Sequence, residues 1–200
     1  MRRREPNKVR IIGGRWRSRI VSFARAENVR PTPDRVRETL FNWLGQDLSG
    51  RNCLDLFAGS GALGFEALSR GAESVVMVDS NPLVIRSLRN NAARLGAREI
   101  LLVQDDALEF LGNADARFDV IFIDPPYRSE LGGRVLELLP AVLAAGGRVY
   151  LESGAALQPV AGWTLLRCGR AGQAHFHLLA READDKGGVS GNVRPDHSRT

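Results

Sequence analysis

The stretch "LDLFAGSGALGFEAL" (54–68) decides the fold class, because it joins an apolar run to a helical pattern through a glycine-rich turn. Gly59, Gly61 and Gly64 have the spacing G-x-G-x-x-G, and Asp79 ends the next apolar run twenty residues after Gly59. This pattern is typical of the first βαβ unit of a doubly wound sheet that binds an adenosine cofactor at the turn. The glycines alone do not distinguish a nicotinamide or flavin cofactor from another adenosine ligand.

Apolar runs and helical patterns alternate from residue 52 onward. Such alternation predicts βαβ units, with a mostly parallel sheet that has helices on both faces. The predicted strands are 53–57, 74–78, 100–103, 118–123 and 147–151, and the predicted helices lie near 61–70, 81–95, 105–112 and 130–144. Two further runs in 163–182 surround a Gly169–Gly172 turn and predict antiparallel C-terminal strands. We therefore expect an α/β, Rossmann-like fold.

The N-terminal part has its own pattern. "VRIIGGRWRSRIV" (9–21) predicts a β-hairpin that turns at the two glycines. The segment 30–44 predicts a helix in which Thr32 is the N-cap and Pro33 the first helical residue. The polar, glycine-rich end of the chain is expected to be unfolded. The predicted division is a basic arm or hairpin (1–30), a catalytic domain (31–182) and a disordered tail (183–200).

Charge is distributed unevenly. The chain has a net charge of +5, but residues 1–30 hold ten Arg or Lys against two Glu, so they carry +8 and the rest −3. A basic arm favours a polyanionic partner such as nucleic acid, although a merely solvated tail is the alternative. In an extended hairpin Arg15, Arg17 and Arg19 would share one face, opposite Trp16. The predicted RNA-binding residues are Arg10, Arg15, Arg17, Arg19, Arg35 and Arg37.

Size and composition restrict the class of protein. Two hundred residues with 44% hydrophobic and 26% charged side chains suit one globular domain. The basic start lacks the apolar segment of a secretory signal, and no run approaches the roughly 18–20 apolar residues that span a bilayer. We expect a cytoplasmic monomer without a membrane or metal partner, in which Cys53 and Cys168 are core thiols.

Asp55 indicates which adenosine ligand the turn accepts. It lies four residues before Gly59, where the negative charge of a pyrophosphate would be repelled. S-adenosylmethionine instead carries a sulfonium and an α-ammonium, and its carboxylate suits the helix N-terminus near Ser60. Asp79 would accept from the ribose hydroxyls, and Asp106 from the adenine amine. The predicted cofactor-binding residues are Asp55, Phe57, Gly59, Ser60, Gly61, Asp79, Ser80, Asp106 and Ala107.

The stretch "IDPPYRSE" (123–130) predicts the catalytic site, because the carboxyl ends of neighbouring parallel strands meet in one crevice. The Asp124 carboxylate and the Pro125 carbonyl can each accept one N–H of an exocyclic base amine, on which positive charge develops during methyl transfer. Pro125 and Pro126 have no N–H to compete. Tyr127 would stack on the extruded base.

These stretches resemble a known family. "DLFAGSG" resembles motif I of the class I S-adenosylmethionine-dependent methyltransferases, and "DPPY" resembles their amino-methylating [NDS]-P-P-[YFW] motif. Over about residues 9–182 the chain closely resembles the RsmD family, which methylates N2 of a guanine in bacterial 16S ribosomal RNA. The resemblance implies that Asp124, Pro125 and Tyr127 hold the guanine amine, that the glycine turn with Asp79 and Asp106 holds the cofactor, and that 30–42 covers the site.

Other functions are compatible with parts of the pattern. The acceptor pair also suits adenine N6 or cytosine N4 in RNA or DNA, so the choice of guanine, and of the small ribosomal subunit as partner, comes from the resemblance alone. A dehydrogenase would share the glycine turn but is disfavoured by Asp55. A ribosome-binding module without catalysis is disfavoured by the intact turn and acceptor motif.

Overall fold

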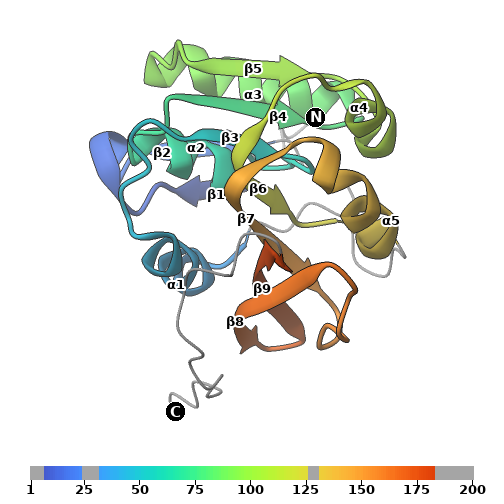
Figure 1. Cartoon of the computed structure of the whole chain (residues 1–200). Coiled ribbons are helices and arrows are strands. Elements are labelled where there is room, and N and C mark those ends of the chain that lie inside the picture. The colour runs from blue at the N-terminus through green and yellow to red at the C-terminus, as the bar shows by residue number, and fades with distance from the viewer. Residues whose placement is uncertain (1–6, 24–31, 126–130, 183–200) are drawn as a thin grey trace.

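The computed structural model describes residues 7–23, 32–125 and 131–182, with a seven-stranded sheet at its centre (Figure 1). Its strands are β3 (Asn52–Asp55), β4 (Ser74–Val78), β5 (Ile100–Val103), β6 (Phe118–Ile123), β7 (Leu143–Ser153), β8 (Trp163–Ala171) and β9 (Ala174–Arg181). The strand order is β5-β4-β3-β6-β7-β9-β8, and the first five strands are parallel. β9 is antiparallel to both of its neighbours. This confirms the predicted doubly wound sheet with antiparallel C-terminal strands.

Helices cover both faces of the sheet, as the near-continuous apolar strands require. They are α1 (Asp34–Leu44), α2 (Ala62–Ser69), α3 (Pro82–Leu95), α4 (Ala107–Asn113) and α5 (Leu131–Leu138). Along β6, Phe122 packs in one core with residues of α1, α2 and α3, whereas Ile121 and Ile123 pack in a second core with residues of α4 and α5. The alternation of side chains along the strands therefore separates the two cores.

The helix predicted over 130–144 is wrong in its second half. α5 ends at Leu138, a short 3₁₀ turn covers Leu139–Ala141, and β7 begins at Leu143. Pro140 has no N–H to continue an α-helix. The backbone N–H of Phe118 in turn binds the Val142 carbonyl at 2.8 Å, so this segment is already held by the sheet.

The N-terminal hairpin is present, but its connection is not extended. β1 (Asn7–Arg10) pairs antiparallel with β2 (Ile20–Phe23), and a 3₁₀ turn (Gly14–Trp16) lies between them. The prediction that Arg15, Arg17 and Arg19 share one face required an extended strand. It is wrong, because Arg15 lies in the 3₁₀ turn and Ser18 has a φ of 68°. Gly14 has a φ of +70°, and a Cβ there would collide with the Ser69 carbonyl at the end of α2. This close approach places Trp16 in the core, where it packs against other apolar side chains.

The start of α1 also differs from the prediction. Pro33 occupies the N-cap position of the helix, and no side chain of the described residues caps it. The Thr32 hydroxyl donates to Asp124 Oδ2 at 3.2 Å instead. The predicted capping role of Thr32 is therefore wrong, because a distant acceptor takes the hydroxyl that would have bonded to the helix.

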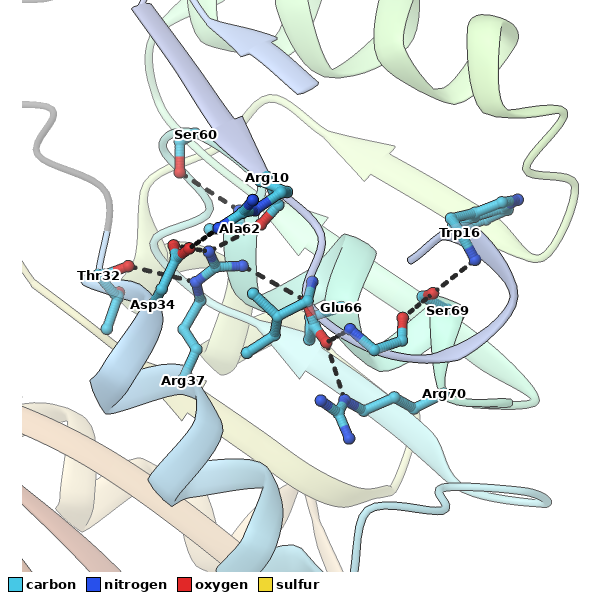
Figure 2. Close-up of polar contacts among 12 residues, drawn as sticks. Arg10, Trp16, Thr32, Asp34, Arg37, Ser60, Ala62, Glu66, Ser69 and Arg70 are labelled. Atoms are coloured by element: carbon cyan, nitrogen blue, oxygen red, sulfur yellow. Dashed lines mark hydrogen bonds and ion pairs between the residues drawn. The ribbon is translucent and has the colours of Figure 1, made fainter. Parts of the chain in front are cut away.

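Hairpin, α1 and α2 meet at one buried carboxylate (Figure 2). Glu66 of α2 has no exposed surface and accepts from the backbone N–H groups of Ile12 and Gly13, both at 2.8 Å. It also accepts from Arg37 of α1 at 3.3 Å and from Arg70 at 2.8 Å. Four donors from three segments compensate the burial of this charge.

The two cysteines, both predicted to be core thiols, differ in their burial. Cys53 is fully buried in β3, as predicted, whereas Cys168 lies half-buried on the edge strand β8.

Within the described ranges, no helix is long and apolar enough to cross a membrane.

Glu66→Gln should lower the free energy of unfolding by about 3 kcal/mol, because the amide leaves the buried guanidinium of Arg37 and the partly buried one of Arg70 without their shared anion. Urea denaturation measures this change. Glu73→Gln, at an exposed position just after α2, is the control and should change the free energy by less than about 0.5 kcal/mol. Equal stabilities of the two variants would contradict a structural role for Glu66.

Candidate active site

The glycine turn between β3 and α2 has the predicted strand–turn–helix geometry. Gly61 is the N-cap of α2 in the left-handed region, with a φ of 77°, where glycine is favoured. The Ala58 N–H donates to the carbonyl of Val78 at 2.9 Å, and the Gly59 N–H donates to Asp79 Oδ2 at 3.0 Å. Ser60 is buried beside the turn. The turn is thus fixed to the carboxyl end of β4.

Asp55 lies beneath this turn as a buried carboxyl. Its Oδ2 accepts from the backbone N–H of Gly64 at 3.0 Å, in the first turn of α2. Burial raises the pKa of Asp55 to about 7, against the opposing effect of the Gly64 hydrogen bond. A Cβ at Gly64 would collide with the Met77 side chain and lie 3.1 Å from this carboxylate, so glycine permits the close contact of helix and strand.

Asp79, at the end of β4, holds two loops together. Besides the Gly59 bond of its Oδ2, its Oδ1 accepts from the Asn81 N–H at 2.8 Å. Burial raises the pKa of Asp79. A carboxylate offers about four lone-pair sites, so these two bonds leave room for a ligand hydroxyl.

The remaining predicted cofactor residues lie around this turn and the start of α4. Asp106 is the N-cap of α4, and its Oδ1 accepts from the N–H groups of Leu108 at 2.8 Å and Glu109 at 3.4 Å. Its first role is therefore structural, and any contact to an adenine amine needs its other lone pairs. Ala107 is buried, Phe57 is half-buried, and Ser80 is exposed.

Asp124 follows β6 at the same edge of the sheet. It is half-buried, and the Thr32 hydroxyl is its hydrogen-bond donor. Burial, and then the negative charge of Glu152, raise the pKa of Asp124 to about 8. Pro125 is half-buried beside it, whereas the predicted catalytic residues Pro126 and Tyr127 lie outside the described residues.

Three residues next to Asp124 are not among the predicted site residues. They are Thr32, Tyr150 and Glu152. The Tyr150 hydroxyl, fully buried, donates to Glu152 Oε2 at 3.0 Å, and β7 pairs with β6 so that Tyr150 lies opposite Phe122. Period-two alternation in "VYLES" puts both side chains on one face of β7, and the parallel register places their end of the strand beside Asp124. That pattern could have predicted them.

Four carboxyl groups therefore gather along the carboxyl ends of β3, β4, β6 and β7. They belong to Asp55, Asp79, Asp124 and Glu152, and each has a pKa raised above its ordinary value, mainly because of burial. None of the four forms an ion pair with another residue in the described part of the chain. A cationic ligand would relieve this repulsion, whereas a pyrophosphate would increase it.

The predicted RNA-binding arginines fall into separate groups. Arg37 is fully buried in the Glu66 network, so its predicted contact to RNA is wrong: a side chain without exposed surface cannot reach a phosphate. Arg10 is exposed and pairs with Asp34 at 3.4 Å, near Thr32. Arg15 pairs with Glu99, just before β5, and Arg19 binds a carbonyl near the end of α3. Arg15 and Arg19 therefore lie near the amino end of β5, away from the four carboxyl groups at the carboxyl ends of the strands. Arg17 and Arg35 are exposed.

Comparison with known proteins gives consistent matches over nearly the whole described chain. A family model described as Conserved hypothetical protein 95 matches residues 9–180. Ribosomal RNA small subunit methyltransferase D of Escherichia coli K12 is 41% identical over 182 residues, which are 88% of this chain and 91% of that protein. The protein of the same name from Haemophilus influenzae is 37% identical, over 86% and 93% of the two chains.

Solved structures agree with these relatives. An Escherichia coli structure described as methyltransferase yhhF has a TM-score of 0.79 at 40% identity and covers 88% of this chain and 99% of that chain. The T. thermophilus 16S rRNA N2 methyltransferase RsmC, in complex with AdoMet and guanosine, has a TM-score of 0.67 at 24% identity and covers 88% and 50% of the two chains. The second likeness concerns the fold alone.

The ligand-free protein should lose stability as pH rises from 5.5 to 8.5. Asp55 and Asp124 have folded pKa values of about 7 and 8, above the ordinary 3.8, so the folded state holds protons that the unfolded state releases. Their stabilising contribution is complete below about pH 4 and is lost as pH passes through 7 to 8. Asp55→Asn should remove the contribution of Asp55, about a few kcal/mol. The free energy of unfolding, measured by urea denaturation, should then decline less steeply with pH.

Asp115→Asn is the control for this measurement, because Asp115 is an exposed carboxylate before β6, at the opposite edge of the sheet. It should keep the pH dependence of the wild-type protein. If Asp55→Asn also kept it, Asp55 would not be a protonated buried group.

Proposed function

The chain belongs to the RsmD family of small-subunit ribosomal RNA methyltransferases, and from this membership and the site we infer how it acts. It transfers a methyl group from S-adenosylmethionine to the exocyclic N2 amine of a guanine in 16S ribosomal RNA. The observation that carries the mechanism is the position of Asp124 and Pro125 at the carboxyl end of β6, next to the glycine turn that follows β3.

We propose that Asp124 and Pro125 accept the two N–H groups of the base amine. The amine lone pair is delocalised into the ring and must leave the ring plane to attack, and two fixed acceptors favour that geometry. Pro125 presents a carbonyl without a competing N–H. As positive charge develops on the nitrogen, the ionised Asp124 stabilises it and is placed to take the released proton. Pro126 and Tyr127, in the same motif, are proposed to complete the site and stack on the base.

S-adenosylmethionine supplies an electrophilic methyl group on a sulfonium when it is bound. We propose that the glycine turn, with Gly59, Ser60 and Gly61, lies against its methionine part, and that Asp55 contributes negative charge beneath that part. Asp79 would bind the ribose hydroxyls through its remaining lone pairs. The other predicted contacts are Phe57, Ser80, Asp106 and Ala107.

The acceptor pair by itself fits the exocyclic amine of adenine or cytosine as well as that of guanine. We propose guanine N2 because the chain resembles the RsmD family, which methylates that amine; the names of its relatives specify small-subunit ribosomal RNA and not the base. The four carboxyl groups at the sheet edge also disfavour the dehydrogenase alternative, because NAD carries a pyrophosphate.

We further propose the context in which the enzyme acts. The substrate is 16S ribosomal RNA within an assembling or assembled small subunit, in the cytoplasm, and the enzyme works as a monomer without a metal ion. The basic N-terminal part, 1–30, contacts RNA through Lys8 and Arg10 near the site, and through Arg15, Arg17 and Arg19 further away. The domain 31–182 carries the catalytic residues, and the tail 183–200 is not required for them.

Asp124→Ala should lower methyl transfer at least about a hundredfold, because it removes a preorganised charged acceptor from the reacting nitrogen. Asp124→Asn keeps a carbonyl acceptor and should retain partial activity. The measurement is transfer of labelled methyl groups to 16S ribosomal RNA or small subunits, with the modified base located by mass mapping. Cofactor and RNA affinities should stay near those of the wild-type protein.

Asp115→Asn is the control and should be fully active. Equal loss in the asparagine and alanine variants would mean that a neutral acceptor is insufficient and that the negative charge of Asp124 is essential, contrary to the partial activity expected for asparagine. Wild-type activity of Asp124→Ala would refute this assignment, and a modified adenine or cytosine would refute the proposed base.

Replacing Lys8 and Arg10 with alanine should weaken RNA binding and flatten its salt dependence by about 0.7–0.9 in slope for each lost phosphate contact. The control is the double alanine variant of Arg117 and Arg148, exposed or half-buried arginines at the amino edge of the sheet. It removes the same charge away from the site and should leave the slope nearly unchanged. Equal effects of the two double variants would mean that only net charge matters.

A further inference from the structure

Thr32 donates its hydroxyl to Asp124 Oδ2 at 3.2 Å, across 92 residues of sequence. We propose that Thr32 is a positioning residue for methyl transfer: it fixes one oxygen of Asp124, so that the other is oriented to accept from the base amine. This inference rests on the catalytic role of Asp124 proposed above. It gives a function to a residue whose sequence context predicts a helix cap.

The hydroxyl of Thr32 is not needed by the helix that follows it. Pro33 is the N-cap of α1, and the first helical backbone bond runs from the Arg37 N–H to the Pro33 carbonyl at 3.1 Å. Thr32 is nonetheless only 5% exposed. A buried hydroxyl needs a partner, and in the described structure that partner is the catalytic carboxylate.

The backbone of Thr32 is held as firmly as its side chain. Arg37, fully buried, donates from Nε to the Thr32 carbonyl at 3.2 Å. Its Nη2 donates to the Arg10 carbonyl at 2.8 Å and to Asp34 Oδ1 at 2.6 Å, while Nη1 binds Glu66 (Figure 2). The planar guanidinium thus connects the end of β1, the start of α1 and the segment that carries Thr32.

Thr32, which binds Asp124, also lines an open cavity of about 360 Å³ beside β1 and β2 of the hairpin. Lys8, Arg10 and the apolar side chain of Ile20, which is 42% exposed, contribute to this cavity, together with Asp34, which pairs with Arg10. Such a lining suits a strand of RNA, with phosphates near the cations and a base against the apolar surface. The residues that line the cavity are Lys8, Val9, Arg10, Ile20, Thr32, Pro33 and Asp34.

The electrostatic surroundings of Asp124 explain why a donor matters here. The groups that face it are Glu152 and Tyr150 from β7, Asp55 from β3 and the Thr32 hydroxyl. The two acids and burial favour the protonated carboxyl, which cannot serve as a full acceptor, whereas the Thr32 hydrogen bond lowers the pKa of Asp124. Thr32 therefore supports both the orientation and the ionised state that the reaction requires.

The test compares Thr32→Val, which keeps the shape but removes the hydroxyl, with Thr32→Ser, which keeps the hydroxyl. Thr32→Val should lower kcat roughly 10–100-fold, the effect of losing a hydrogen bond to a charged group, with KM for RNA and Kd for S-adenosylmethionine nearly unchanged. Its deficit should be larger at pH 6.5 than at pH 9. Thr32→Ser should restore most of the activity.

Thr39→Val is the matched control, because the Thr39 hydroxyl binds the Arg35 carbonyl within the same helix, at 3.0 Å. It should have wild-type kcat. Melting temperatures of all variants report folding, and Thr32→Ala replaces Thr32→Val with the same expectation if the valine variant does not fold. Wild-type kcat in Thr32→Val, or equal loss in the serine and valine variants, would overturn the proposal.

A second readout needs no substrate and so separates this proposal from the proposed function. Carbon NMR of proteins labelled at the aspartate carboxyls follows the titration of Asp124 in the ligand-free state. In Thr32→Val the titration should move to higher pH, and in Thr32→Ser and Thr39→Val it should not. An unchanged titration in Thr32→Val would refute the role of Thr32 even if the wild-type protein methylated a different base.

Discussion

The buried carboxylate of Glu66 is the interaction on which the arrangement of the N-terminal segments depends. It has no exposed surface, so its charge must be compensated within the protein. Its four donors come from the hairpin turn, from Arg37 of α1 and from Arg70 of its own helix. Hairpin and α1 consequently dock together on α2, and removal of one of them would leave charged groups unpaired.

The same network continues to the site. Arg37 holds the carbonyl of Thr32, and the hydroxyl of Thr32 holds Asp124. A surface that carries Lys8 and Arg10 is therefore joined through two buried residues to the carboxylate at the end of β6. One set of hydrogen bonds thereby connects two charged regions. The positive region is proposed to contact RNA, and the negative region is proposed to face the cationic cofactor and the developing ammonium.

Local patterns were sufficient for the sheet and the glycine turn. Apolar runs predicted the strands from β3 to β6. Strands of a parallel sheet are covered by helices on both faces, so nearly every residue in each strand must be apolar. The prediction failed where a distant group decided the local structure. Thr32 has the sequence of an N-cap but bonds to Asp124, and Arg37 has the sequence of a surface arginine but lies within the core.

The sequence by itself therefore determined the α/β class, the turn at Gly59 and Gly61, and the position of Asp124 and Pro125 after β6, because the information for each lies within a few consecutive residues. Only the tertiary structure decided which carboxyl groups meet and which arginines remain exposed. Asp124 and Glu152 come together through the pairing of β6 with β7, and Thr32 reaches them through the Glu66 network. Hydrogen bonds between residues far apart in the chain leave no periodic pattern, since each depends on how whole elements pack.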